Sequence, residues 1–249
     1  MSQATQAEIR PSRAVDRRIN PVPRMVSTAD GYERWAPTYD HSPNPLLARE
    51  ERYLTPMLTE LQFNSVLDLA CGTGRWLQKL LRQNSASGVG IDLSAAMLQI
   101  AERKGEMRGR LAQAACENLP IATSAFDLVI CSFALGHIPD LGPVACELKR
   151  VTMPGANVFI SDLHPAAYQH GWRVGFRDRE ASVQIEVQSH STHEIVAAFS
   201  SNQFDCIAQL PLWLGEPEQP LFARAGKSES FADACQLPAI LVCHFRRVE

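Results

Sequence analysis

Two short segments constrain the fold of this chain more than any others. Residues 66–76 read Val-Leu-Asp-Leu-Ala-Cys-Gly-Thr-Gly-Arg-Trp, an apolar strand that leads directly into a Gly-x-Gly turn. Eighteen residues after Gly74, a second apolar strand ends at Asp92. Glycines in such a turn let a ligand approach the backbone because no Cβ is in the way. An acid at the end of the next strand suits the two hydroxyls of a ribose. The pattern therefore predicts a nucleoside-binding half of an open α/β sheet.

The turn differs from the dinucleotide-binding fingerprint. Leu77 stands where the pattern Gly-x-Gly-x-x-Gly has its third glycine. Asp68 lies inside the strand, four residues before Gly72. A carboxylate there would repel a pyrophosphate, whereas it would attract the ammonium group of an amino-acid moiety. A nicotinamide-dependent oxidoreductase is therefore disfavoured, although it remains an alternative at this point.

The pattern Asp-x-x-x-Gly-x-Gly followed by a strand-end acid resembles the class I S-adenosylmethionine-dependent methyltransferases. Further segments are similar to the small-molecule members related to the quinone-biosynthesis group, and they follow in the family's order. They are Gly-Tyr-Glu-Arg-Trp-Ala-Pro-Thr-Tyr-Asp at 31–40, Glu-Asn-Leu-Pro at 117–120, Ser-Ala-Phe-Asp-Leu-Val at 124–129, Phe-Ala-Leu-Gly-His-Ile-Pro-Asp at 133–140, Glu-Leu-Lys-Arg-Val at 147–151 and Pro-Gly at 154–155. The resemblance covers most of residues 29–246. It implies S-adenosylmethionine as cofactor and transfer of its methyl group to a small organic acceptor by in-line displacement.

The resemblance also assigns cofactor-binding positions. The methionine part would lie over Ala70, Gly72 and Gly74, with Asp68 nearby, and Asp92 would hold the ribose. Leu93 and Met97 would flank the adenine, Tyr39 would cover the cofactor and Ser132 would lie beneath it. The family often has an acidic residue for the adenine amino group at the end of the third strand, but this chain has Ala115-Cys116. That contact is therefore assigned to the Cys116 backbone and Glu117. For Tyr39 the alternative is simple packing of the first helix.

Two histidines are the candidate catalytic residues. A sulfonium methyl is already activated, so the main tasks are alignment of the reacting atoms and exclusion of water. A general base helps where the acceptor is a hydroxyl, an acidic carbon or a protonated nitrogen. His137 follows the fourth strand and His164 follows the fifth, at the edge where open α/β sheets bind ligands. Each has a structural role as its alternative, and Asp162 would either orient His164 or face the sheet. No third metal ligand is evident, so we expect no metal.

Apolar segments alternate with helical patterns along the chain. Strands are expected at 65–70, 87–92, 110–115, 126–132 and 156–161, then at 205–214 and 238–246, with helices at 29–36, 49–61, 141–152 and 192–201 and another capped by Ser94 and ended by Gly105. The alternation predicts an α/β fold, a Rossmann-like doubly wound, mostly parallel sheet with helices on both faces. Residues 164–190 break the alternation and predict a small inserted cap, a hairpin after strand five that covers the substrate. Four aromatic residues would line the acceptor site or form a small core of their own, namely Trp172, Phe176, Trp213 and Phe222.

Composition narrows the setting. The 249 residues carry a net charge of −3, which argues against a nucleic-acid partner, and no apolar stretch is long enough to cross a membrane. The seven cysteines form no Cys-x-x-Cys pair and predict buried thiols in the cytoplasm. We expect a flexible N-terminal arm at 1–25, a methyltransferase domain at 26–249, and a monomer or homodimer. A non-catalytic nucleoside-binding regulator on the same fold is the remaining alternative.

Overall fold

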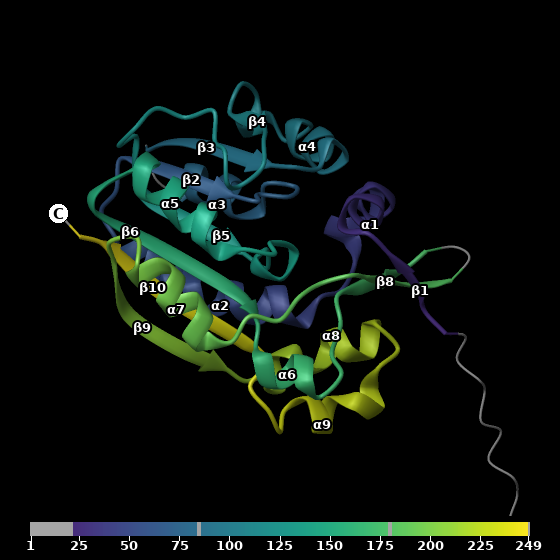
Figure 1. Ribbon diagram of the computed structural model, residues 1–249. Helices are drawn as coiled ribbons and strands as arrows, with labels where there is room; N and C mark the ends of the chain where they lie inside the picture. Colours follow the sequence, from purple (N-terminus) through teal and green to yellow (C-terminus); the bar gives the residue numbers. More distant parts are fainter. Residues whose placement is uncertain (1–21, 84–85, 179–180, 249) are drawn as a thin grey trace, which may run out of the picture.

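The structure is a computed structural model that describes residues 22–83, 86–178 and 181–248. A large sheet is formed by β2 (Ser65–Leu69), β3 (Ser87–Asp92), β4 (Leu111–Gln113), β5 (Phe126–Ser132), β6 (Thr152–Leu163), β9 (Phe204–Leu212) and β10 (Ile240–Arg247). A small sheet is formed by β1 (Arg24–Val26), β7 (Gly175–Arg177) and β8 (Ser182–Ile185). The two sheets lie apart, with the helices packed around the larger one (Figure 1).

The helices cover both faces of the large sheet. The α-helices are α1 (Thr28–Trp35), α2 (Pro45–Glu60), α3 (Arg75–Gln83), α4 (Ala95–Glu102), α5 (Leu141–Val151), α6 (Pro165–Gln169), α7 (Thr192–Ser200), α8 (Gln219–Arg224) and α9 (Phe231–Ala234). The 3-10 helices are η1 (Ala36–His41), η2 (Gly105–Met107), η3 (Leu135–His137), η4 (Glu216–Glu218) and η5 (Ser228–Ser230). In the part of the chain that the structure describes, no helix is long and apolar enough to cross a membrane.

The order of the strands positions the site. The large sheet runs β4-β3-β2-β5-β6-β10-β9, parallel from β4 to β6, while β10 pairs antiparallel with both β6 and β9. The chain starts at the centre with β2, builds outward to β4, then returns to the other side of β2 with β5. Such a reversal leaves a crevice at the carboxyl ends of the two central strands. The Gly-x-Gly turn follows β2 and therefore lies at this crevice.

The expected α/β architecture is confirmed, and most elements lie where the sequence predicted them. β3 and β5 match their expected ranges, and Ser94 caps α4 by accepting from the Met97 N–H. Three details differ. Helix α4 ends at Glu102, and Gly105 instead begins η2. Strand β4 is shorter than the expected 110–115. Strand β6 extends through 152–163, with its start paired to Phe126 of β5 and its end paired to the antiparallel β10.

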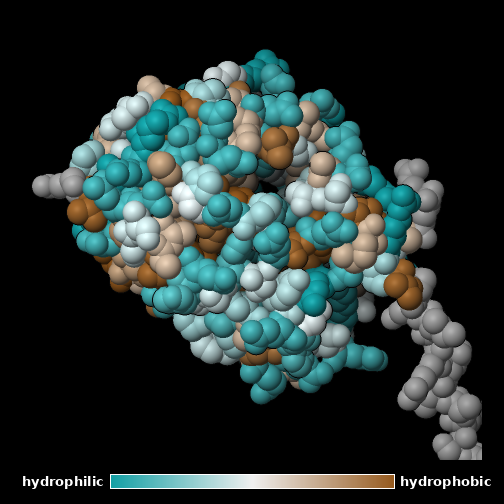
Figure 2. Space-filling model, viewed as in Figure 1, coloured by the Kyte–Doolittle hydropathy of each residue, from teal (hydrophilic) through white to brown (hydrophobic). Residues whose placement is uncertain are grey.

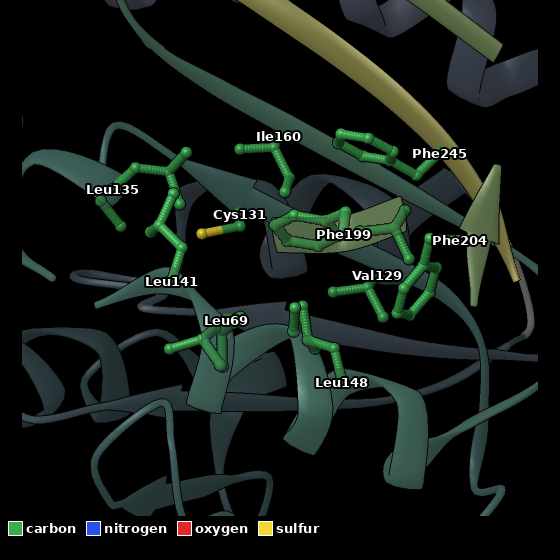
Figure 3. Close-up of a cluster of buried hydrophobic side chains, with 14 of the residues drawn as sticks. Leu69, Val129, Cys131, Leu135, Leu141, Leu148, Ile160, Phe199, Phe204 and Phe245 are labelled. Atoms are coloured by element: carbon green, nitrogen blue, oxygen red, sulfur yellow. The ribbon is translucent and has the colours of Figure 1, made fainter. Parts of the chain in front are cut away.

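Two apolar cores lie on opposite faces of the large sheet. One core packs α5 and α7 against β5, β6 and β10, with the Phe199 and Phe245 rings stacked at 4.5 Å between centroids. Figure 3 shows this cluster, with the Cys131 thiol among its aliphatic and aromatic side chains. The other core packs α2, α3 and α8 against the opposite face. Both faces of the parallel strands are thus buried, which explains their nearly continuous apolar sequence.

The insertion after β6 does not fold alone. Its strands β7 and β8 form the expected hairpin, but β8 also pairs in parallel with β1, so Val26 lies opposite Ile185. Helix α1 packs on this sheet, with the Trp35 ring stacked on Phe176 at 5.0 Å and the Arg34 guanidinium paired with Asp178. We use the term cap for β1, α1, η1, β7 and β8 together. In Figure 1 the cap lies beyond the edge of the large sheet toward which the arrow of β3 points.

Two expectations are corrected by the cap. Most of the arm expected at 1–25 lies outside the described residues, but Arg24 and Met25 belong to β1 and are paired with β8. The four expected wall aromatics do not gather on one surface. Phe176 belongs to the cap, Trp172 and Phe222 pack into the core beneath α2, and Trp213 is exposed. Side-chain packing within separate layers outweighs the apolar attraction among the four.

The surface is otherwise typical of a folded domain in water. The face drawn in Figure 2 is mainly hydrophilic, with hydrophobic residues visible in the recesses near its centre. Large exposed apolar side chains occur singly along the chain, as at Leu93, Ile207 and Trp213. Isolated apolar residues of this kind are common on folded proteins and need no partner to explain them.

Replacement of Leu67 tests the role of β2 as the centre of the fold. Leu67 is fully buried, whereas Leu93 is 64% exposed. Leu67→Ala is expected to lower the free energy of unfolding by about 2–5 kcal/mol because it leaves a cavity in the core. Leu93→Ala is expected to change it by less than about 0.5 kcal/mol. Urea denaturation of both variants measures the difference, and equal effects would contradict the described burial.

Candidate functional site

The turn after β2 has the backbone shape that the sequence predicted. Ala70, Gly72 and Gly74 all have positive φ, at 54°, 55° and 75°. A Cβ added to Gly72 would meet only the Met97 Cε, at 4.0 Å, so this glycine faces open space. A Cβ added to Gly74 would lie 2.2 Å from the Met107 Cε. Gly72 is therefore suited to close approach by a ligand, and Gly74 supplies the left-handed backbone conformation of the turn beside Met107 of η2.

Asp92 lies beside this turn at the end of β3. One carboxylate oxygen accepts from the Gly72 N–H at 2.7 Å, and the other accepts from the Ser94 N–H at 2.7 Å. Burial raises the pKa of Asp92, and these backbone N–H groups oppose the rise. The acid that the sequence placed at the strand end is thus aimed at the turn. Leu93 beside it is exposed, and the buried Met97 has its Cε at the open space above Gly72.

Asp68 has a structural partner. Its side chain is 2% exposed, and it accepts from the Leu77 N–H of α3 at 2.9 Å. Burial raises its pKa to about 7. The carboxyl group thus anchors the start of α3 against β2. On the adenine side of the expected site, Cys116 is partly buried and Glu117 is exposed. Their assigned contact with the adenine stays a prediction.

A buried carboxylate joins the elements under the turn. Glu50 of α2 is fully buried and accepts from the Arg75 guanidinium and from the Trp76 Nε1–H at 3.2 Å. It also accepts from the hydroxyls of Ser132, at 2.7 Å, and Ser161. We call these five residues the Glu50 network. The network connects α2, α3, β5 and β6, and it holds Ser132, which the sequence placed beneath the cofactor.

The segment that carries Tyr39 is tied to the glycine turn. Asp40 accepts from the Thr73 hydroxyl at 2.5 Å and pairs with Lys104 at 2.8 Å. The Lys104 ammonium also donates to the Thr73 carbonyl at 2.7 Å. Burial raises the pKa of Tyr39 to about 12, so its hydroxyl stays protonated. The Tyr39 ring packs in the cap, edge-on to the Trp35 ring with 4.9 Å between centroids. The bond from Thr73 to Asp40 holds this segment next to the turn.

His137 is bonded on both sides by α1. The Thr28 hydroxyl donates to the Glu186 carbonyl at 3.3 Å, so its oxygen accepts from Nδ1–H of His137 at 3.2 Å. Nε2 then carries the lone pair and accepts from the Tyr32 hydroxyl at 2.9 Å. Burial lowers the pKa of His137 to about 4. The imidazole is therefore neutral at pH 7, in the form that accepts a proton, although as a weaker base than an exposed histidine.

The two candidate histidines are not brought together. His164 caps α6, because its Nδ1 accepts from the Ala166 N–H at 3.1 Å. A small pocket at the ends of β5 and β6 is instead lined by His137, Asp162 and His190, with mainly apolar neighbours. Asp162 does not orient His164; it accepts from the Gly136 N–H at 2.8 Å and the Leu163 N–H at 2.6 Å. Only His137 of the pair lines the pocket, and the catalytic role of His164 has no support from its position.

Several site residues were missed by sequence reasoning. Tyr32 lies in the segment 31–40 that carried the resemblance, but its hydroxyl partner is more than 100 residues away. Glu50 precedes Leu54 and Leu58 at helical spacing, and all three are buried. A carboxylate on the buried stripe of an amphipathic helix was the available signal. The pairing of Asp40 with Thr73 and Lys104 left no such signal in the sequence.

Adjacent glutamates provide a matched test of the Glu50 network. Glu50→Gln is expected to lower the free energy of unfolding by about 3 kcal/mol because it leaves the Arg75 guanidinium without its buried partner. Glu51 is 38% exposed; it pairs with Lys79 at 2.5 Å and makes only a long contact with Arg75, at 3.4 Å. Glu51→Gln is therefore expected to cost less than about 1 kcal/mol. Chemical denaturation measures both, and a similar small loss in the two variants would show that the network is not central to stability.

Comparison with known proteins agrees with this geometry. Residues 66–155, from β2 to the start of β6, match the family model described as a methyltransferase domain. Over 138 residues the chain is 33% identical to demethylmenaquinone methyltransferase of Lactiplantibacillus plantarum, covering 51% of this chain and 58% of that relative. The chain thus matches a little over half the length of this curated relative.

Solved structures share the fold. An S-adenosylmethionine dependent methyltransferase from Mesorhizobium loti matches with a TM-score of 0.63 and 19% identity, covering 82% of this chain and all of that one. Geranyl diphosphate C-methyltransferase from Streptomyces coelicolor A3(2), solved with S-adenosyl-L-homocysteine, matches with a TM-score of 0.60 and 16% identity, covering 81% and 76%. Residues 66–155 of this chain thus match the methyltransferase-domain family, and the chain shares the fold of S-adenosylmethionine-dependent methyltransferases.

Proposed function

We propose that this protein transfers the methyl group of S-adenosylmethionine to a small organic acceptor. One observation carries the proposal. His137 lines the same pocket as Asp162 and is hydrogen-bonded to Tyr32, on which the carboxylates of both Asp92 and Asp162 act. Asp92 borders the glycine turn, and Asp162 lines the small pocket. A donor at the turn and an acceptor in the pocket would therefore meet beside Tyr32 and His137.

The residues at the turn fit the cofactor. Gly72 leaves open space above the backbone, and the Asp92 carboxylate can exchange its backbone donors for the two hydroxyls of a ribose. Met97 borders that space and offers an apolar, polarizable contact for the adenine ring. The backbone of Ala70 and Gly72 remains the proposed support for the methionine part. When bound, S-adenosylmethionine supplies an electrophilic methyl group.

The chain's own residues would align the acceptor and exclude water. The cap covers the edge of the sheet and is held to the turn by Asp40, Thr73 and Lys104. Closure of this kind keeps water from the reacting atoms. His137 would take a proton released by the acceptor, through the Tyr32 hydroxyl bonded to its Nε2. In-line displacement to oxygen, nitrogen or carbon is compatible with this arrangement.

The proposed setting follows from charge and cysteine chemistry. A net charge of −3 favours a small molecule over a nucleic acid as the acceptor. All seven cysteines are free, three of them buried, which fits the reducing cytoplasm. A demethylmenaquinone-like ring is one acceptor class, suggested by the name of the curated relative. Non-catalytic nucleoside binding on the same fold is the second candidate, because the structural neighbours share only the fold.

Removal of the Asp92 carboxylate tests the cofactor site. Asp92→Ala is expected to weaken binding of S-adenosylhomocysteine by about tenfold to a hundredfold, since hydrogen bonds to a charged group are worth about 1.5–3 kcal/mol. Asp205→Ala, which alters an exposed acid at the start of β9, is the matched control and should bind normally. Isothermal titration calorimetry measures both affinities. Unchanged affinity in Asp92→Ala would overturn the ribose assignment.

Replacement of His137 tests the proton acceptor. His137→Gln and Tyr32→Phe are each expected to lower turnover by about 10²–10⁴-fold if the acceptor must lose a proton. Affinity for S-adenosylhomocysteine should stay unchanged in both. The assay follows isotope-labelled methyl transfer into a metabolite extract by mass spectrometry, with exposed His193→Gln as control. Full turnover in both variants would leave alignment alone as the mechanism, and cofactor binding without any labelled product would favour the non-catalytic candidate.

A further inference from the structure

The pocket is lined by the carboxylate of Asp162 and by the imidazoles of His137 and His190. Asp162 lines it, and neither lysine nor arginine is among the described residues that do so. None of the ion pairs formed by the described residues includes Asp162. The remaining lining is largely apolar and includes the rings of Phe133 and Tyr168. A phosphate or carboxylate on the acceptor would find no lysine or arginine among the described lining residues and would be repelled by Asp162.

Asp162 is built to carry a negative charge. Its two oxygens accept from the backbone N–H groups of Gly136 and Leu163 at 2.8 and 2.6 Å, which stabilises the ionised form. Burial raises its pKa to about 6 despite these donors, so the carboxyl group is mostly ionised at pH 7. A buried carboxylate without an ion-pair partner is costly. His190 offsets part of this cost, and a cationic ligand in the pocket would offset more of it.

Burial and the nearby carboxylates also disfavour an anionic nucleophile. The pKa of Tyr32 is raised well above its ordinary value, mainly by burial and further by Tyr39, Asp92 and Asp162. Burial is the largest cause, and it would disfavour the phenolate of a bound acceptor in the same way. A phenol or enol acceptor beside Tyr32 would meet the same two carboxylates when it lost its proton. A nucleophile that reacts while neutral avoids this cost.

We propose that the pocket binds an apolar amine in its protonated form, with Asp162 as the counter-ion, and that nitrogen is the methylated atom. The inference rests on the proposed function and deepens it by naming the acceptor class. The ammonium passes one proton to the Asp162 carboxylate, which is a stronger base here than His137, and from there to solvent. The free amine nitrogen forms the new N–C bond as the donor's S–C bond breaks, and the electron pair of that bond stays on sulfur. The product is the N-methylated ammonium ion.

Three probes of similar shape and different charge test the pocket directly. The full chain is first titrated with S-adenosylhomocysteine, and the saturated protein is then titrated with benzylamine, benzyl alcohol or benzoate. Calorimetry or ligand-observed NMR measures binding. Benzylamine is expected to bind at least about tenfold more tightly than the other two, because it alone pairs with the desolvated carboxylate. The first titration tests the cofactor site separately from the acceptor class.

A variant and a pH series assign the preference to Asp162. Asp162→Asn is expected to abolish the preference for benzylamine while circular dichroism and the affinity for S-adenosylhomocysteine stay unchanged. Asp140→Asn alters an exposed acid before α5 and is the matched control. In the unaltered chain, benzylamine affinity should fall as the pH drops through about 6, because the Asp162 carboxyl then becomes protonated and neutral.

The same pH series distinguishes the titration of Asp162 from that of the other titratable groups that face it. They are Tyr32 of α1, His137 of η3, Tyr168 of α6 and His190 before α7. Tyr32 stays protonated, and His137, with a pKa of about 4, stays neutral through this range. Repeating the series in His190→Gln removes the remaining imidazole, and the fall in benzylamine affinity should persist.

The outcomes are distinct. If S-adenosylhomocysteine does not bind, the proposed function fails and this inference fails with it. If it binds but benzyl alcohol or benzoate matches benzylamine, or none of the three binds, the amine assignment alone is overturned. Retention of the preference in Asp162→Asn would also overturn it. In the extract assay, the labelled product should behave as a cation on ion-exchange at pH 7, and a neutral or anionic product would contradict the inference.

Discussion

The Glu50 carboxylate is the interaction on which the site depends most. Moving a carboxylate out of water is costly, and it is tolerated only where hydrogen bonds and an opposite charge compensate it. Arg75, Trp76, Ser132 and Ser161 provide both, and they come from α3, β5 and β6. Because these donors converge only in the folded state, the network sets how α2 and α3 lie under the glycine turn.

The cap adds a second constraint, imposed from the opposite side. Strand β1 and the hairpin β7–β8 are more than 140 residues apart in sequence, yet they form one sheet. Helix α1 rests on that sheet and delivers Thr28 and Tyr32 to His137. The cap is thus more than a cover. It supplies the hydroxyl groups that determine which nitrogen of His137 carries the lone pair.

The site has two carboxylates, and a neutral hydrogen-bonded pair of side chains lies between them. Asp92 is held by backbone donors at the glycine turn, and Asp162 is held in the same way at the pocket. Between them, burial keeps Tyr32 protonated and His137 neutral. A site with this charge distribution favours positively charged and neutral ligands, and the sulfonium of the proposed cofactor is such a ligand.

The amino-acid sequence alone determined the α/β fold, the strand ranges around the glycine turn, and the positions of Asp92 and His137 at the sheet edge. These follow from local signals, namely apolar runs, glycine spacing and the rule that carboxyl ends of parallel strands share one edge. The tertiary structure decided the partners. It paired Tyr32 with His137, joined β1 to β8, assigned His164 to the start of α6, and buried Asp68 behind α3. Contacts between residues far apart in the chain depend on how whole layers pack, and no local pattern encodes that packing.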